Sequence, residues 1–280
     1  MKTPCSPLLL SFCLVLASSL SLRAAVLQID PGTQTGSTVV NNATAPYAIA
    51  GDSTWNQGGN TISTTLYADG SPSGTAVAMG KATFETTTTL SFTGGLSTLG
   101  GTGTGTLFTG NPAQNSVFSG GSNVQDGIVG MRISGLAAGE YDIYVAGVYL
   151  GTATERRVGG STPAAQAVWA FGGANVASLD YNTVDQTVSG TGIASQSAFD
   201  ILENTNANTW TQGDNYARGT VTLAAGEDLY ILTSGDRNAT GISNNEYRGW
   251  MNLVQVVGVP EPASSALLAL ALPLLMRRRR

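Results

Sequence analysis

Short runs of alternating apolar and polar residues constrain the fold of this chain more than any other feature of its sequence. Residues 62–67 and 129–134 alternate in this way, and segments rich in glycine, serine and asparagine separate such runs. A period of two places successive side chains on opposite faces of a β-strand. No segment between residues 26 and 257 shows a long helical period. The pattern therefore predicts an all-β domain.

The run at residues 141–145 differs from the others, because apolar residues continue after it as far as Leu150. A nearly continuous apolar segment is typical of a strand that is buried on both faces, so we expect this strand at the centre of a sheet. Further strands are expected at residues 82–92, 167–171, 199–202, 220–223, 229–233 and 251–257.

One pentapeptide, Leu-Ala-Ala-Gly-Glu, occurs twice, at residues 136–140 and 223–227. Each copy fits a tight turn in which the glycine takes a positive φ angle between two antiparallel strands. We therefore expect positive φ angles at Gly139 and Gly226, within two related hairpins of an antiparallel β-sandwich.

The composition excludes most catalytic chemistry. The sequence has no histidine, and both cysteines, Cys5 and Cys13, lie within its first 25 residues. Catalytic triads, histidine metal sites and thiolate sites are therefore excluded from the rest of the chain. Gly51-Asp52-Ser53 is similar to the nucleophile block of the Gly-Asp-Ser-Leu esterases, but Thr54 replaces the leucine and no histidine can activate the serine. We predict that the protein is not an enzyme.

The region between the two terminal segments is acidic. Residues 25–259 hold 7 of the 13 basic residues and 17 of the 18 acidic ones, so their formal charge is 7 − 17 = −10. Binding to phosphate depends on lysine and arginine, and a surface of this sign repels nucleic acid and anionic lipid. Neither is expected as a partner of this region.

Two sets of residues are candidates for ligand binding. Asp180, Asn182 and Asp185 offer clustered oxygen ligands of the kind that calcium prefers, although Asp and Asn also form turns without a metal. Trp55 and Trp210 lie beside segments rich in asparagine or glycine, where a flat ring could stack on a sugar or simply pack within a loop. No cofactor is expected beyond a possible structural calcium ion.

Two weaker patterns suggest other functions. Carboxylates are frequent between residues 180 and 236, and a glycosidase needs only two of them at the correct separation, but no spacing singles out a pair. The threonine run at 86–89 resembles a strand face that could order water for ice binding, yet only one such strand is visible. Both functions remain remote alternatives.

Both ends of the sequence have the pattern of targeting segments. Residues 1–25 contain Lys2, an apolar stretch and small residues through Ala24-Ala25, as in a secretory signal peptide. At the other end, Val259-Pro260-Glu261-Pro262 precedes an apolar run at 263–276 and then Arg277, Arg278, Arg279 and Arg280. That apolar run reaches only about 21 Å as a helix, against a bilayer core of about 30 Å. The pattern predicts transient anchoring and later processing.

This C-terminal arrangement resembles the PEP-CTERM sorting signal of bacterial exported proteins. In that family a Pro-Glu-Pro motif, a short hydrophobic helix and a basic cluster are recognised by an integral-membrane exosortase. The resemblance covers about the last 22 residues. It implies export, processing by an exosortase, and association with exopolysaccharide or biofilm matrix. It also implies that the protein meets the membrane only through this helix, and only before processing.

Together these patterns predict three parts: a signal peptide (1–25), a β-sandwich domain similar to a jelly roll (26–257), and a sorting signal (258–280). We expect an exported, non-catalytic protein of the cell surface or extracellular matrix, with a structural role in exopolysaccharide. The alternative is a carbohydrate-binding β-sandwich module, for which a glycan is the partner.

Overall fold

The computed structural model describes residues 24–32, 37–41, 45–82, 96–99, 107, 116–119, 128–147, 166–172, 179–182, 187–190, 193–200, 209–212, 216–234 and 250–259. All regular elements in these ranges are β-strands, so the described part of the chain is all-β, as predicted. Among these residues, no helix is long and apolar enough to span a membrane. The chain divides into one unit of Ala25–Val259 and a second of Met1–Ala24 with Pro260–Arg280.

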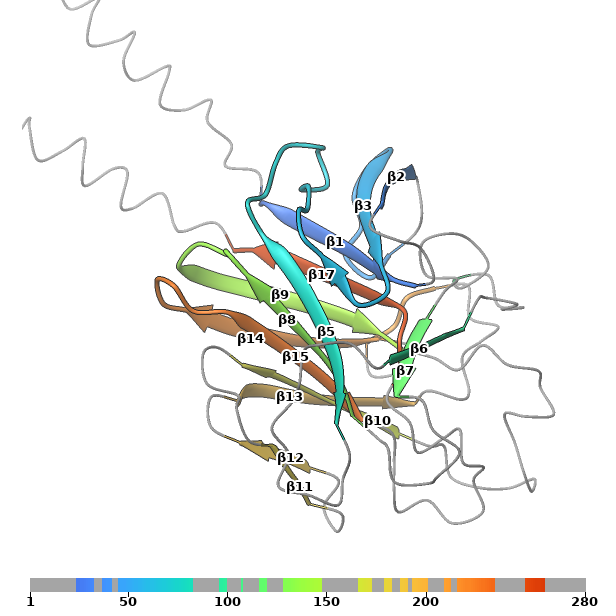
Figure 1. The fold of residues 1–280 in the computed structure, drawn as a ribbon, viewed down its shortest axis with the longest axis vertical. Helices are drawn as coiled ribbons and strands as arrows, with labels where there is room; N and C mark the ends of the chain where they lie inside the picture. Colours follow the sequence, from blue (N-terminus) through green and yellow to red (C-terminus); the bar gives the residue numbers. More distant parts are fainter. Residues whose placement is uncertain are drawn as a thin grey trace, which may run out of the picture. The chain divides into compact units, whose positions relative to one another are not determined.

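The first six-stranded sheet joins strands from the two ends of the unit to strands from its middle. β1 and β17, near the two ends, pair antiparallel, and β17 also pairs with β9 (Figure 1). β1 and β3 are parallel, whereas the other pairs of this sheet are antiparallel. In spatial order the strands are β14 (Ala217–Leu223), β9 (Gly139–Ala146), β17 (Leu253–Gly258), β1 (Val26–Pro31), β3 (Ser53–Gly58) and β2 (Ser37–Asn41).

All neighbouring strands of the second six-stranded sheet pair antiparallel, and β8 and β15 lie near its middle. Its order is β13 (Ile193–Asp200), β10 (Gln166–Gly172), β15 (Leu229–Ser234), β8 (Ile128–Ser134), β5 (Ala76–Ala82) and β4 (Thr61–Ile62). Two small sheets complete the described strands: β11 (Leu179–Asn182) with β12 (Thr187–Gly190), and β16 (Trp250–Met251), β7 (Ser116–Ser119) and β6 (Leu96–Leu99).

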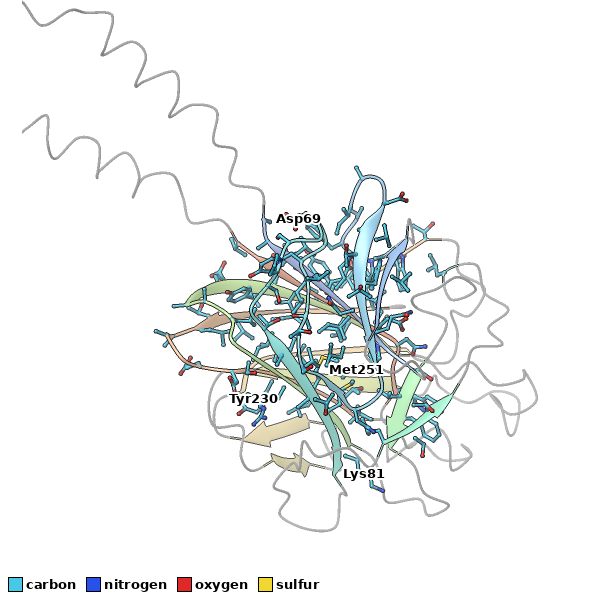
Figure 2. The ribbon with its side chains drawn as sticks, turned by 45° about the horizontal axis from the view of Figure 1, so that its top comes forward. Asp69, Lys81, Tyr230 and Met251 are labelled. Atoms are coloured by element: carbon cyan, nitrogen blue, oxygen red, sulfur yellow. The ribbon has the colours of Figure 1, made fainter. Side chains whose placement is uncertain are left out.

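Side chains of both large sheets meet in one hydrophobic cluster. Ile29 and Ile143 come from the first sheet, Met131 and Ile231 come from the second, and all four are fully buried. Met251 of β16 is buried in the same cluster (Figure 2). Burial of one such side chain contributes about 1.5–3 kcal/mol, so this shared core is the main apolar contribution to stability in the described part.

Both Leu-Ala-Ala-Gly-Glu segments connect the two large sheets, and neither forms a hairpin. φ is +154° at Gly139 and +80° at Gly226, which confirms the predicted positive angles. The first segment leads from β8 in the second sheet to β9 in the first, and the second leads from β14 in the first sheet to β15 in the second. The prediction of paired flanking strands is therefore wrong. Other strands occupy both edges of β8 and β9, so these two cannot pair with each other.

The strand predicted at residues 62–67 ends at Ile62, because other groups bind the backbone beyond it. Asn56 Oδ1 accepts a hydrogen bond from Leu66 N (2.8 Å), and Asn56 Nδ2 donates to Leu66 O (2.8 Å). Ser73 N also donates to Thr65 O (3.2 Å). A side-chain amide thus replaces the neighbouring strand that this segment would need.

Strand β3 has no apolar alternation in its sequence, Ser-Thr-Trp-Asn-Gln-Gly, yet all six residues are buried. Its polar side chains are hydrogen-bonded within the sheet, as when Asn56 Nδ2 donates to Gln28 O (2.8 Å). Burial of satisfied polar side chains removes the periodic signal on which strand prediction depends.

Candidate functional site

The outward face of β9 and β14 carries polar and aromatic side chains at alternate positions. On β9, Ile143 and Val145 are buried in the core, whereas Asp142 and Tyr144 are partly exposed. On β14, Ala217 alternates with exposed residues in the same way. Pairing places Arg218 opposite Tyr144 and Thr220 opposite Asp142. Four polar or aromatic side chains are therefore neighbours on one face of the first sheet.

Four aromatic rings form a continuous series at this face, which we call the aromatic row. The ring centroids of Tyr47 and Tyr144 are 5.7 Å apart, those of Tyr144 and Tyr216 are 6.0 Å apart, and those of Tyr216 and Trp210 are 6.4 Å apart. All four residues are partly exposed. The rings are tilted by 39–72° between neighbours, so they form an uneven apolar surface rather than a stack.

A charged pair borders the aromatic row. Arg218 Nη2 donates to Asp142 Oδ2 at 2.7 Å, and Thr220 Oγ1 donates to Asp142 Oδ1 at 2.8 Å. The Arg218 guanidinium carbon lies 5.4 Å from the centroid of the Tyr144 ring, within the range of a cation–π interaction. The hydrogen bond to Asp142 raises the pKa of Arg218, and burial raises the pKa of Tyr144. Asp142 thus fixes the cation beside the ring.

Tyr47 reaches this face from the segment between β2 and β3, and Gln255 of β17 holds its backbone. Tyr47 N donates to Gln255 Oε1 (2.9 Å), and Gln255 Nε2 donates to Tyr47 O (3.0 Å). Gln255 Nε2 also donates to Gln28 Oε1 (2.9 Å), and Gln28 Nε2 donates to Ser53 Oγ (2.9 Å) and Thr54 O (3.0 Å). This chain of buried amides, which we call the amide ladder, crosses three adjacent strands and supports one end of the row.

A second hydrophobic cluster supports the other end of the row. It contains Ala45, Trp55, Leu107, Ala146 and Leu253, and both Trp210 and Tyr216 pack against it. The tryptophans proposed from the sequence as ligand contacts therefore share one cluster, but they differ in exposure. Trp55 is 0% exposed and presents no face to a ligand, whereas Trp210 is half-buried and belongs to the aromatic row.

The buried carboxyl of Asp30 lies on the same sheet, outside the aromatic row. Asp30 is 1% exposed, and Gln57 Nε2 donates to its Oδ2 at 2.6 Å. Its Oδ1 has no hydrogen-bond partner in the part of the chain that the structure describes. Burial raises the pKa of Asp30 from its ordinary value of 3.8 to about 7. Among the described residues, the hydrogen-bond partner of the Asp30 carboxyl is thus the amide of Gln57 and not a second carboxylate.

The remaining predicted site residues fall largely outside the described region. Asp180 and Asn182 are on β11, where only the backbone is described, and Asp185 lies outside the described residues. Among described residues, no group of three or more His, Cys, Asp or Glu could hold a metal ion. Ser53 is buried, with its hydroxyl accepting a hydrogen bond from Gln28.

Of the predicted processing residues, Val259 alone is described. Its N–H donates to Glu140 O at 2.9 Å, and the preceding Gly258 N donates to Ala25 O at 2.9 Å. Pro260, Glu261, Pro262 and Arg277 to Arg280 lie outside the described residues. The hydrogen-bonded sheet thus extends to the residue before the Pro-Glu-Pro motif.

Sequence reasoning missed Tyr47, Tyr144, Tyr216 and the Asp142–Arg218 pair. One usable signal was present, because Asp142 and Tyr144 occupy the polar positions of an alternating strand. The partners of Asp142 on β14, Arg218 and Thr220, are 76 and 78 residues away, and pairing between strands that far apart cannot be read from one sequence.

Comparison with known proteins gives little further information. No protein-family profile and no curated protein matches the chain. One solved structure with a similar arrangement is an isomalto-dextranase from Arthrobacter globiformis T6 in complex with panose, with 15% sequence identity and a TM-score of 0.32. The match covers 82% of this chain and 34% of that one, so this chain spans about a third of the enzyme's length.

Proposed function

We propose that this protein is an exported, non-catalytic component of the bacterial cell surface or extracellular matrix, that its two large sheets form a β-sandwich, and that the aromatic row binds a glycan. The aromatic row carries the binding part of the proposal. Partly exposed rings offer apolar faces to the C–H groups of a pyranose, and Asp142, Arg218 and Thr220 beside them offer donors and acceptors to its hydroxyls.

The support beneath the row favours binding over simple surface packing. The amide ladder holds the backbone of Tyr47 through two hydrogen bonds, and Tyr216 and Trp210 pack against the second hydrophobic cluster. Rings held in place before binding lose little conformational entropy when a ligand arrives. The resemblance of the C-terminal residues to a PEP-CTERM sorting signal supports export and processing by an exosortase, and the expected glycan-rich surroundings agree with a glycan ligand.

Affinity electrophoresis tests the binding proposal directly. The purified protein is run through native gels that contain an uncharged polysaccharide, with dextran, galactomannan and xylan as separate probes. We expect retardation by at least one of them, with a dissociation constant in the micromolar to millimolar range, about −4 to −8 kcal/mol. Unchanged mobility with all three would contradict glycan binding by the row and would leave the structural role in the matrix.

A further inference from the structure

We propose that Asp142 makes the aromatic row selective for uncharged glycans by neutralising Arg218, an inference that rests on the proposed glycan-binding function. Arg218 is the described cation that borders the row; the other described cations, Lys81 and Arg132, belong to β5 and β8 of the second sheet. Among the described residues, the positive charge beside the row therefore depends on whether the Arg218 charge is compensated.

The hydrogen-bond geometry shows that it is compensated. Arg218 Nη2 and Asp142 Oδ2 are 2.7 Å apart, and Thr220 donates to the second carboxylate oxygen at 2.8 Å. The Asp142 side chain is 17% exposed and that of Arg218 is 42% exposed. A charge-assisted hydrogen bond at this distance is the strong kind, so an incoming carboxylate would meet a guanidinium whose charge Asp142 already compensates.

The same pair still suits an uncharged ligand. A guanidinium carries five N–H donors, and the described bond to Asp142 involves Nη2. Its ion pair also holds the guanidinium 5.4 Å from the centre of the Tyr144 ring, which places donors next to an apolar face. Hydroxyl groups of a neutral pyranose can accept from such donors without competing for the charge.

The wider electrostatic field acts in the same direction. Residues 25–259 carry a formal charge of 7 − 17 = −10, which disfavours the approach of a polyanion. The negative charge of this region therefore repels a uronate-containing glycan at long range, and at short range the compensated Arg218 attracts it only weakly. Neither effect weakens the binding of an uncharged glycan.

The substitution Asp142→Asn separates charge from shape. Asparagine keeps the size of the side chain and an oxygen that can accept from Arg218 or Thr220, while it removes the negative charge.

The full chain is studied in a polyoxyethylene detergent, since sugar-based detergents would compete for the row. Affinities for alginate, a polyuronate, and for the three uncharged polysaccharides are measured at low ionic strength by affinity electrophoresis.

We expect the unchanged protein to bind its best uncharged polysaccharide at least about ten-fold more tightly than alginate. Asp142→Asn should raise the ratio of alginate affinity to uncharged-glycan affinity about ten-fold, and about 0.5 M salt should remove that gain. The double variant Asp142→Asn/Arg218→Gln should lack the gain, because the uncompensated cation is then absent. A merely structural role for Asp142 would produce neither the salt dependence nor the dependence on Arg218.

The outcomes distinguish this inference from the function on which it rests. An unchanged protein that binds alginate as tightly as the uncharged polysaccharides would overturn the selectivity while leaving glycan binding intact. So would an Asp142→Asn variant with an unaltered affinity ratio. Binding to none of the four polysaccharides would overturn the proposed function, and the selectivity with it.

Discussion

Gln28 and Gln255 face each other across β1 and β17, and the Gln255 amide nitrogen donates to the Gln28 amide oxygen at 2.9 Å. Both side chains are at most 1% exposed, although 227 positions separate them in the sequence. Their four amide N–H groups and both oxygens are all used, by one another, Tyr47, Ser53 and Thr54. Two buried polar side chains thus join the ends of the described unit and support the aromatic row.

The first prediction concerns this ladder. Gln255→Leu removes an acceptor from Tyr47 N and donors from Tyr47 O and Gln28 Oε1, leaving three polar groups without their partner. We expect a loss of about 2–4 kcal/mol in the free energy of unfolding, measured by urea denaturation. Gln212→Leu is the control, because Gln212 is exposed and its substitution should change stability by about 0.5 kcal/mol or less. Equal stability in the two variants would show that the ladder contributes nothing.

The second prediction concerns the pH dependence of stability. The pKa of Asp30 is about 7 in the folded protein and 3.8 as its ordinary value, so between these values the folded state holds a proton that the unfolded state releases. Its stabilising contribution is complete below pH 3.8 and is lost as the pH rises through 7. The full difference is on the order of 4 kcal/mol.

Asp30→Asn tests this effect. The carboxamide oxygen can still accept from Gln57, while no charge forms in the buried site at any pH. We expect the variant to be more stable than the unchanged protein at pH 8 and to lack the fall in stability between pH 4 and 7. Parallel urea titrations across this range supply the comparison, and identical pH profiles would show that Asp30 is ionised at little cost.

The third prediction compares two glycines with nearly the same backbone angle. φ is +83° at Gly135 and +80° at Gly226, so an alanine is strained by about 1–2 kcal/mol at either position. A Cβ at Gly135 would lie 2.5 Å from Gly74 O, whereas one at Gly226 would meet nothing within 4 Å. Gly135→Ala should therefore cost at least about 1 kcal/mol more than Gly226→Ala, because backbone must move. Thermal denaturation of both variants measures the difference, and equal melting temperatures would refute the close approach.

The sequence predicted those strands that have a local apolar–polar period, but not those that depend on contacts with distant residues. Strands such as β8 and β14 have an alternating pattern of side chains, so a local period identifies them. β3 carries no such period, because Asn56 and Gln57 are buried through hydrogen bonds to residues far away in the sequence. The fold class was therefore predictable, whereas β3 and the connections between the sheets were not.

The candidate site shows the same division. The sequence predicted both Trp210 and Trp55 as ligand contacts, because each lies beside a polar segment. Trp55 is fully buried, so the same signal was correct in exposure for one residue only. Burial depends on which segments cover a strand, and that information is non-local. The pairing of Arg218 with Asp142 likewise follows from the register of β9 and β14, which a single sequence does not contain.

The fourth prediction concerns the C-terminal motif. If an exosortase recognises Pro260, Glu261 and Pro262, replacing all three with alanine should leave export intact, and the unprocessed chain should accumulate in the inner membrane. Mass spectrometry of the protein from cells that carry the unchanged sequence supplies the reference. A surface form that still ends in Arg280, without modification, would rule out processing at this motif.

The central claim is that the aromatic row binds glycan, and one comparison of tyrosines tests it most directly. Tyr144 occupies the middle of the row, whereas Tyr230 is a partly exposed tyrosine on β15 of the second sheet (Figure 2). Isothermal titration calorimetry with the best-bound uncharged glycan should show at least about a ten-fold loss of affinity for Tyr144→Ala, or about 1.4 kcal/mol. Tyr144→Phe, which keeps the ring, and Tyr230→Ala should both stay within about three-fold of the unchanged protein. Equal affinities for Tyr144→Ala and Tyr230→Ala would contradict the account.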